Sequence, residues 1–135
     1  MAVVGFTFTK MVAERKSDVR EKVNISNNIT VTNVEMSDLP FGQQKQEALK
    51  INFLFVSSFE PVIGSIELHG NLLYTGEAKE LKEIAKNWGK DKKLPSEVMK
   101  YVLSAMMNKC NIQALILSRD VALPPPVPLP RISVR

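Results

Sequence analysis

The stretch GSIELHGNLLYTGEAKELKEIAKNWG, residues 64–89, contains the position at which the hydrophobic pattern of this chain changes. Up to Thr75 apolar and polar residues alternate, as they do in a β-strand with one buried face. After Gly76 apolar residues recur every three to four positions, as they do along one face of an α-helix. Strands therefore come first and helices last, an order that predicts an α+β fold with helices packed on one face of an antiparallel sheet.

Three segments before residue 64 also alternate, so four strands are expected in all. The segment near residues 23–36 shifts its parity after Val31, which predicts a β-bulge or bend. The segment 48–61 carries apolar residues on both faces and is therefore expected to be a central strand. The connections are short, which favours antiparallel pairing because a parallel return needs a long crossover. The first strand is expected to bury Val4, Phe6, Phe8 and Val12 on one face.

Two helices are expected after Gly76. The first has an apolar stripe that includes Leu81, Ile84, Ala85 and Trp88, and Gly89 is its expected end. The second begins after Pro95, which is tolerated in a first helical turn, and is expected to run from about residue 96 to about residue 116. Its apolar residues cover more than one face. Either this helix is deeply buried or it also contacts another subunit.

Five of the eight prolines of the chain lie in ALPPPVPLPR, residues 122–131. The residues between them, Leu123, Val127 and Leu129, are apolar, whereas a solvated linker normally carries Ser, Gly or charge. Proline has few conformations to lose when it docks. We therefore expect a single α+β domain over residues 1–121 and an extended proline-rich tail over 122–135 that lies against protein surface, either its own or that of a neighbouring subunit.

No residue cluster indicates a chemical reaction, and the protein is not expected to be an enzyme or to hold a cofactor. The only histidine, His69, shares a strand face with Glu67, but no nucleophile or second base accompanies the pair. The only cysteine, Cys110, excludes an intrachain disulfide and is expected to be a buried apolar residue. One histidine and one cysteine are too few soft ligands for a metal site. The first ten residues resemble no signal peptide, and no apolar run is long enough to span a bilayer, so a cytoplasmic location is expected.

A basic loop offers an alternative function, although the chain as a whole is only mildly basic, with a net charge of +4. Basic charge beside an aromatic ring can hold single-stranded nucleic acid through phosphate contacts and stacking. Because Trp88 continues the apolar stripe of the first helix, packing in the core is the favoured interpretation, and nucleic-acid binding is kept as the less favoured alternative. The lysines around Trp88 are Lys86, Lys90, Lys92 and Lys93.

The order of four strands, a short helix, a proline-headed loop, a long helix and an apolar ending resembles the bacterial export chaperone SecB. The resemblance is closest in LPSEVMKYVLSAMMNKCNIQALILSRDVALPPP, residues 94–126, and the ending also resembles that of small archaeal proteins without an assigned role. It implies an assembly of identical subunits, a dimer or a tetramer, that binds unfolded polypeptide in apolar grooves near the loop between the helices. SecB is strongly acidic whereas this chain is basic, which puts the export role in doubt.

The resemblance implies one set of polypeptide-binding residues, and the apolar residues of the second helix and of the tail suggest a second set in an oligomer interface or arm. Besides polypeptide binding and nucleic-acid binding, a third function is kept as an alternative, that of a structural adaptor whose proline-rich tail exchanges between subunits. The residues implied for polypeptide binding are Phe53, Phe55, Phe59, Trp88 and Leu94. Those expected in an oligomer interface or arm are Met99, Met106, Met107, Leu123, Val127 and Leu129.

Overall fold

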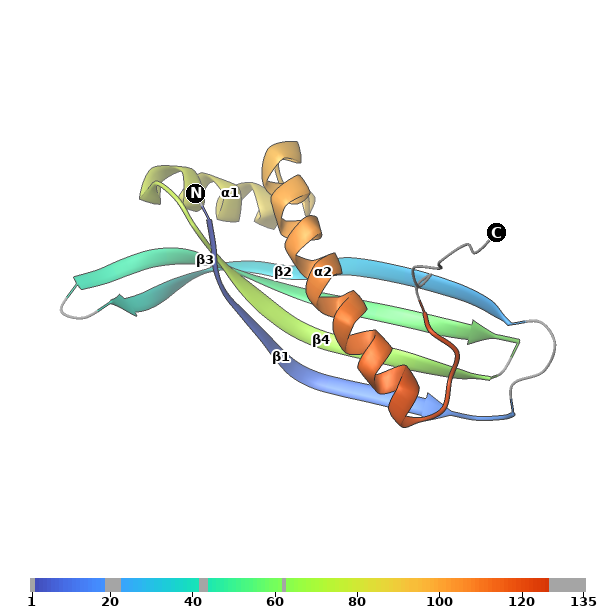
Figure 1. Cartoon of the computed structure of the whole chain (residues 1–135). Coiled ribbons are helices and arrows are strands. Elements are labelled where there is room, and N and C mark those ends of the chain that lie inside the picture. The colour runs from blue at the N-terminus through green and yellow to red at the C-terminus, as the bar shows by residue number, and fades with distance from the viewer. Residues whose placement is uncertain (1, 19–22, 42–43, 62, 127–135) are drawn as a thin grey trace, which may run out of the picture.

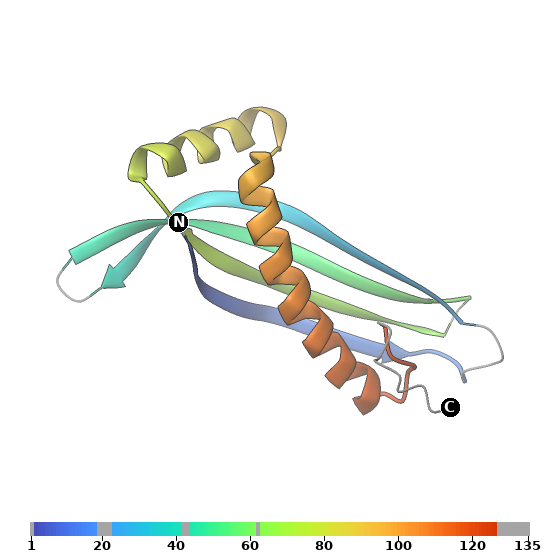
Figure 2. The same ribbon diagram turned by 45° about the horizontal axis from the view of Figure 1, so that its top comes forward.

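The computed structural model describes residues 2–18, 23–41, 44–61 and 63–126. Four strands precede two helices, as the change of pattern at Gly76 predicts. All the pairings are antiparallel, and the sheet has the order β1-β4-β3-β2. The helix α2 crosses one face of the sheet, and α1 lies at one end of it, near the base of the projecting β2–β3 hairpin (Figures 1 and 2). The elements are β1 (Ala2–Arg15), β2 (Asn24–Phe41), β3 (Gln44–Glu60), β4 (Gly64–Thr75), α1 (Ala78–Asp91) and α2 (Ser96–Asp120).

The two inner strands, β3 and β4, supply the centre of the hydrophobic core. Alternate residues of each strand face the helices, and the predicted inner position of β3 between two partners is confirmed. The opposite face of the sheet is only half-buried and carries Glu67 and His69. Burying large apolar side chains at this density supplies most of the free energy that holds such a sheet to its helices. The buried residues of the two strands include Leu49, Ile51, Phe53, Phe55, Phe59, Ile66, Leu68, Leu72 and Tyr74.

The edge strand β1 differs from the prediction at both of its ends. Its register against β4 shifts between Val3 and Gly5 and again between Phe8 and Lys10. Each extra residue moves the following side chains to the other face of the sheet. The prediction that Val4 lies on the buried face with Phe6 and Phe8 is therefore wrong, and Val4 is 46% exposed. Val12 pairs with Glu67 and so lies on the open face, whereas Phe6 and Phe8 pack near the ring of Phe53, with centroid distances of 5.2 Å and 6.3 Å.

The parity shift predicted for the second strand is confirmed. The register of β2 against β3 slips between Val31 and Asn33, and Val34 then lies in the core with 5% exposure. A shift of one residue exchanges the two faces of a strand, so the sequence pattern alone located the bulge to within two residues.

The first helix packs the predicted stripe against the sheet, with Leu81, Ile84 and Trp88 buried. It continues past Gly89 to Asp91, so the prediction that Gly89 ends the helix is wrong. A Cβ at Gly89 would meet no atom within 4 Å, and Lys92 adopts the left-handed conformation, with φ 57°, that closes the helix instead. The backbone N–H of Lys92 donates to the carbonyl oxygen of Trp88 over 3.0 Å, as at helix ends that have a left-handed cap.

The long helix α2 buries one residue in every four along most of its length. A four-residue step exceeds the helical repeat of about 3.6 residues, so the buried stripe winds slowly around the helix as it crosses the twisted sheet. The helix ends at Asp120, four residues beyond the expected position. Its opposite side exposes Tyr101, Ile112 and Ile116. The buried stripe consists of Val98, Val102, Met106, Cys110, Ala114 and Ser118.

The start of the proline-rich segment lies on the chain's own sheet. Leu123 is buried, and its backbone N–H donates to the carbonyl oxygen of Ser118 over 2.7 Å. The side chain of Asn27 donates from Nδ2 to the carbonyl oxygen of Pro126 over 2.8 Å, while its Oδ1 accepts from the Ser57 hydroxyl over 2.6 Å. Pro126 has no backbone N–H to donate, and it is held through its carbonyl oxygen instead. The division at residue 121 into domain and tail stays a prediction.

Candidate functional site

A cavity of about 740 Å³ lies between α1, α2 and the end of β4. Its floor contains Leu81 and Ile84 of α1 and Val98 of α2, which belong to the hydrophobic core. This arrangement follows from the chain path, because α1 continues from the end of β4 and α2 begins beside the far end of α1 (Figure 2). We call this cavity the interhelix groove. The residues that line it are Tyr74, Glu80, Leu81, Glu83, Ile84, Asn87, Pro95, Ser96, Glu97, Val98 and Tyr101.

The charged residues of the interhelix groove are all acidic. Among the described residues Glu80, Glu83 and Glu97 line it and no lysine or arginine does, although the chain has an excess of basic residues. Burial raises the pKa of Tyr74, and the negative charges of Glu80 and Glu97 raise it further. The negative charge of these carboxylates therefore acts on Tyr74, which lines the groove. An occupant suited to it combines apolar side chains with positive charge.

The aromatic side chain at the mouth of the groove is Tyr101. It is 67% exposed, more than any other large apolar residue of the described chain. Its position in the second turn of α2 leaves the ring beside the acidic residues rather than over the sheet. An exposed ring next to a hollow is a typical anchor for a partner, because a large rigid surface is buried at little cost in conformational entropy.

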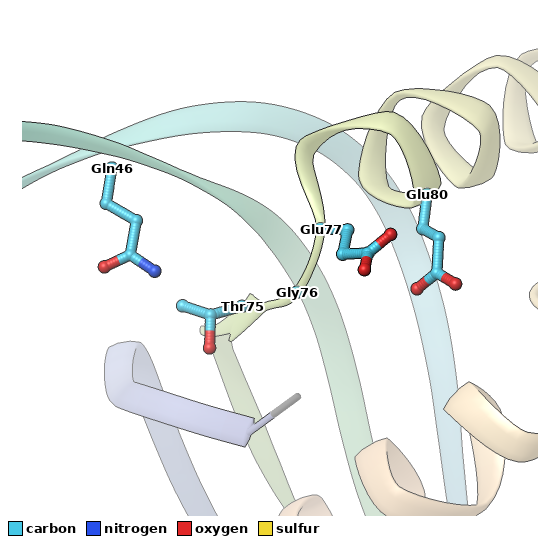
Figure 3. A pocket seen from close by; sticks show the side chains of 5 residues that line it. All are labelled: Gln46, Thr75, Gly76, Glu77 and Glu80. Carbon is cyan, nitrogen blue, oxygen red and sulfur yellow. The ribbon is translucent and has the colours of Figure 1, made fainter.

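A second hollow of about 430 Å³ adjoins the groove and shares Glu80 with it. Figure 3 shows the carboxylates of Glu77 and Glu80 at the beginning of α1, with Thr75 at the end of β4, Gly76 in the connection between them and Gln46 on β3. Acidic residues are favourable at this position because the N-terminal end of a helix carries partial positive charge. We call Glu80, Glu83 and Glu97 the acidic rim of the interhelix groove. Glu77 of the second hollow extends this rim towards the β2–β3 hairpin.

The five residues implied for polypeptide binding are all buried in the single chain. Phe53, Phe55 and Phe59 are at most 2% exposed beneath the helices. Trp88 and Leu94 are 6% and 8% exposed and belong to the same core. Trp88 continues the stripe whose members Leu81 and Ile84 line the groove, and Leu94 precedes the groove residue Pro95, whereas Phe59 pairs with Gly64 at the other end of β4. Their role in binding stays a prediction.

The residues expected in an interface or arm have mixed surroundings. Met106 is fully buried in the chain's own core, whereas Met99 and Met107 are half-buried beside it. Leu123 is buried at the end of the sheet. Val127 and Leu129 lie outside the described residues. Interface roles for this set therefore stay a prediction.

The basic loop keeps its lysines exposed but not its tryptophan. Lys86, Lys90, Lys92 and Lys93 are all exposed, and Nζ of Lys92 lies 5.8 Å from the centroid of the Trp88 ring. The favoured interpretation of Trp88 as a core residue is confirmed. The stacking surface that nucleic-acid binding would use is therefore covered in the single chain.

The polar pair on the open face of the sheet has the geometry that the strand pattern predicts. His69 Nε2 lies 3.5 Å from Glu67 Oε2, on the side of the sheet opposite the helices. Cys110 is fully buried, as predicted, and burial raises the pKa of its thiol to about 12, so it is not a reactive thiolate at neutral pH. Among residues 2–18, 23–41, 44–61 and 63–126, no group of three His, Cys, Asp or Glu is placed to hold a metal ion.

The groove residues that the sequence reasoning missed are the three glutamates and Tyr101. Two of the glutamates, Glu80 and Glu97, lie in first helical turns, where acidic residues are common for reasons of helix stability alone. The signal available in the sequence is the acidic first turn that both helices share, but only the packing of the helices brings these residues to one cavity.

Comparisons with known proteins identify the fold. No family model matches the sequence, and no curated protein is significantly similar to it. Among solved structures, the SecB-like chaperone Rv1957 of Mycobacterium tuberculosis matches with a TM-score of 0.56 at 12% identity, covering 98% of this chain and 89% of that chain. That structure is a complex with a ChAD peptide from the HigA1 antitoxin. The chain described here has a SecB-like fold, which confirms the predicted four-stranded antiparallel sheet with two C-terminal helices. Neither helix of the described chain is long and apolar enough to cross a lipid bilayer.

Proposed function

We propose that this protein is a non-enzymatic, oligomeric chaperone-like protein that binds unfolded or extended polypeptide in apolar surface grooves. The observation that carries the proposal is the interhelix groove, a hollow with an apolar floor and an exposed tyrosine at its mouth. The similar fold of a chaperone whose structure holds a peptide supports it. The chain needs no nucleotide for this function, because binding draws on the burial of apolar surface.

Binding would proceed by transfer of apolar client side chains from water onto the groove floor. Each Å² of apolar surface removed from water contributes on the order of 25 cal/mol. Part of this gain is lost to ordering of the client chain, so affinity per unit area is modest and release needs no energy source. Such binding recognises apolar content rather than one sequence, which is the property a chaperone requires.

Oligomerisation is proposed from the outer side of α2. Ile112 and Ile116 are 60% and 39% exposed on a helix whose other side is already in the core. Exposed apolar residues that gather on one side of a helix are typical of a contact with another protein surface. We expect a dimer or a tetramer in light scattering, and a monomeric mass at micromolar concentration would contradict the proposal.

The test of client binding is suppression of aggregation of a chemically unfolded client at equimolar subunits. Replacement of Tyr101 with Lys places a charge at the mouth of the groove, and we expect it to reduce protection severalfold. The control is Asn108→Lys, which adds the same charge at an exposed position of α2 outside the groove. Equal protection by both variants, or no protection by the unmodified protein, would contradict the assignment.

The alternative of nucleic-acid binding through the basic loop has its own signature. Phosphate contacts by lysines make affinity fall steeply as salt rises. Retention of a single-stranded oligonucleotide at low salt, with loss between 50 and 200 mM salt as expected for phosphate contacts, would favour the alternative over polypeptide binding.

A further inference from the structure

The acidic rim of the interhelix groove matches a segment of the chain's own sequence. Residues 127–135, VPLPRISVR, carry two arginines and no acidic residue, and their other side chains are mostly apolar. The groove presents the complementary set: three carboxylates and no basic side chain above an apolar floor. Charge of opposite sign on the two surfaces steers such a segment towards the groove.

The geometry prevents Arg131 from reaching the groove of its own chain. Pro126 is held by Asn27, which pairs with Ser57, and Ser57 pairs with Ile66. Tyr74, which lines the groove, lies eight residues further along β4 than Ile66, or about 26 Å at ~3.3 Å per residue. The five residues from Pro126 to Arg131 span at most ~17 Å when fully extended. Arg131 of the same chain therefore falls short of the groove.

We propose that residues 127–135 of one copy of the chain occupy the interhelix groove of a second copy, with Arg131 and Arg135 paired to Glu80 and Glu97 and with Ile132 on the apolar floor. We call residues 127–135 the arm. When it is bound, the arm competes with unfolded clients for the groove. This inference rests on the groove of the proposed function and goes beyond it, because it assigns to that groove an internal competitor.

A photo-crosslinker at position 133 tests this inference. Ser133→Cys provides the attachment point, and Cys110 does not compete for the label because it is fully buried. An equal mixture of ¹⁴N- and ¹⁵N-labelled full-length chains is irradiated and digested. We expect cross-links to residues 80–84 or 97–101, with mixed-isotope pairs in statistical proportion to same-isotope pairs. Cross-links confined to same-isotope pairs, or directed to another surface, would overturn the proposal.

Charge reversal separates groove binding from chance proximity. The double variant Glu80→Lys, Glu97→Lys is expected to lower the cross-link yield at least fivefold. The matched control is Glu35→Lys, Glu60→Lys, which makes the same change in net charge at exposed positions outside the groove and should leave the yield unchanged. If the groove variant does not fold, as judged by circular dichroism, Arg131→Glu, Arg135→Glu makes the same test from the arm, which lies outside the described packing.

Mixing the two variants provides the decisive measurement. Each alone should cross-link poorly, whereas a mixture of the groove variant with the arm variant should recover at least half of the original yield, almost all of it in mixed-isotope pairs, because the arm of each variant is complementary in charge to the groove of the other. Failure to recover would overturn the charge pairing. An unfolded client should lower the yield by competition. The protein could protect a client from aggregation while that client leaves the yield of groove cross-links unchanged. In that case the arm assignment stands and the client site of the proposed function is wrong.

Discussion

The two sides of α2 have similar apolar character but opposite surroundings. On the inner side Val102, Met106 and Cys110 are completely buried against the sheet. On the outer side Tyr101 and Ile112 are more than half exposed. Composition alone therefore does not distinguish a core position from a partner-binding position on this helix. The difference lies in what each side faces, and it separates the residues that hold the fold from those available for function.

The inner side should respond most strongly to truncation. Met106→Ala removes a fully buried side chain from beneath α2 and should lower the free energy of unfolding by about 2–5 kcal/mol. Guanidinium denaturation followed by circular dichroism measures the change. A loss below about 0.5 kcal/mol, the usual range for surface substitutions, would show that the inner side is not the core of the folded chain.

The sheet beneath α2 should also resist any increase in volume. A Cβ at Gly70 would contact the carbonyl oxygen of Thr7 and would lie 2.9 Å from Cζ of Phe53. Gly70→Ala therefore requires the backbone of β1 to move and should cost about 1–3 kcal/mol. The matched substitution is Gly89→Ala, where a Cβ meets nothing within 4 Å. Within a helix this change should stabilise the protein by up to about 1 kcal/mol, and equal effects at the two glycines would contradict the packing described.

Burial of the Cys110 thiol should make the free energy of unfolding depend on pH in the alkaline range. Burial raises the pKa of Cys110 from 9.0 to about 12 in the folded chain. The unfolded chain loses this proton first as pH rises, so the contribution to stability is complete below about pH 9 and is lost progressively towards pH 12. Cys110→Ala should flatten the fall of unfolding free energy over this window. An unchanged slope would show that the thiol is accessible to solvent in the folded state.

The outer side should change stability least and association most. Ile112→Ala should alter the free energy of unfolding of the single chain by no more than about 0.5 kcal/mol, because the side chain is 60% exposed. The same change, combined with Ile116→Ala, should shift the mass in light scattering towards the monomer. A large loss of stability at low protein concentration would mean that the outer side is part of the fold rather than an interface.

Much of the fold was predictable because its elements have strong and different periods. The alternation of Ile66, Leu68, Leu72 and Tyr74 and the helical stripe of the first helix depend on local geometry, so the pattern shows them directly. The bulges of β1 were missed because Val3 and Val4 are both apolar, so the pattern of apolar and polar residues allows either of them to be assigned to the buried face. The end of α1 was missed because glycine inside a helix costs only about 1 kcal/mol relative to alanine, so the packed helix can continue through Gly89.

The residues that line the candidate site were not predicted from the sequence. Trp88 and Leu94 were expected to bind polypeptide, but both are buried in the core, so that role stays a prediction. The acidic rim of the interhelix groove was not foreseen, because Glu80 and Glu97 are seventeen residues apart. Each has a sufficient local explanation as a residue of a first helical turn.

Local order and chain direction were determined by the sequence itself: four alternating segments, then two helices, then an apolar proline-rich ending that a solvated linker would not carry. Period and turn chemistry act over a few residues, so they can be read without knowing what packs against them. The tertiary structure alone decided which apolar side of α2 is covered and that acidic residues of both helices line one groove. Both depend on contacts between residues far apart in the chain, and no local pattern records such contacts.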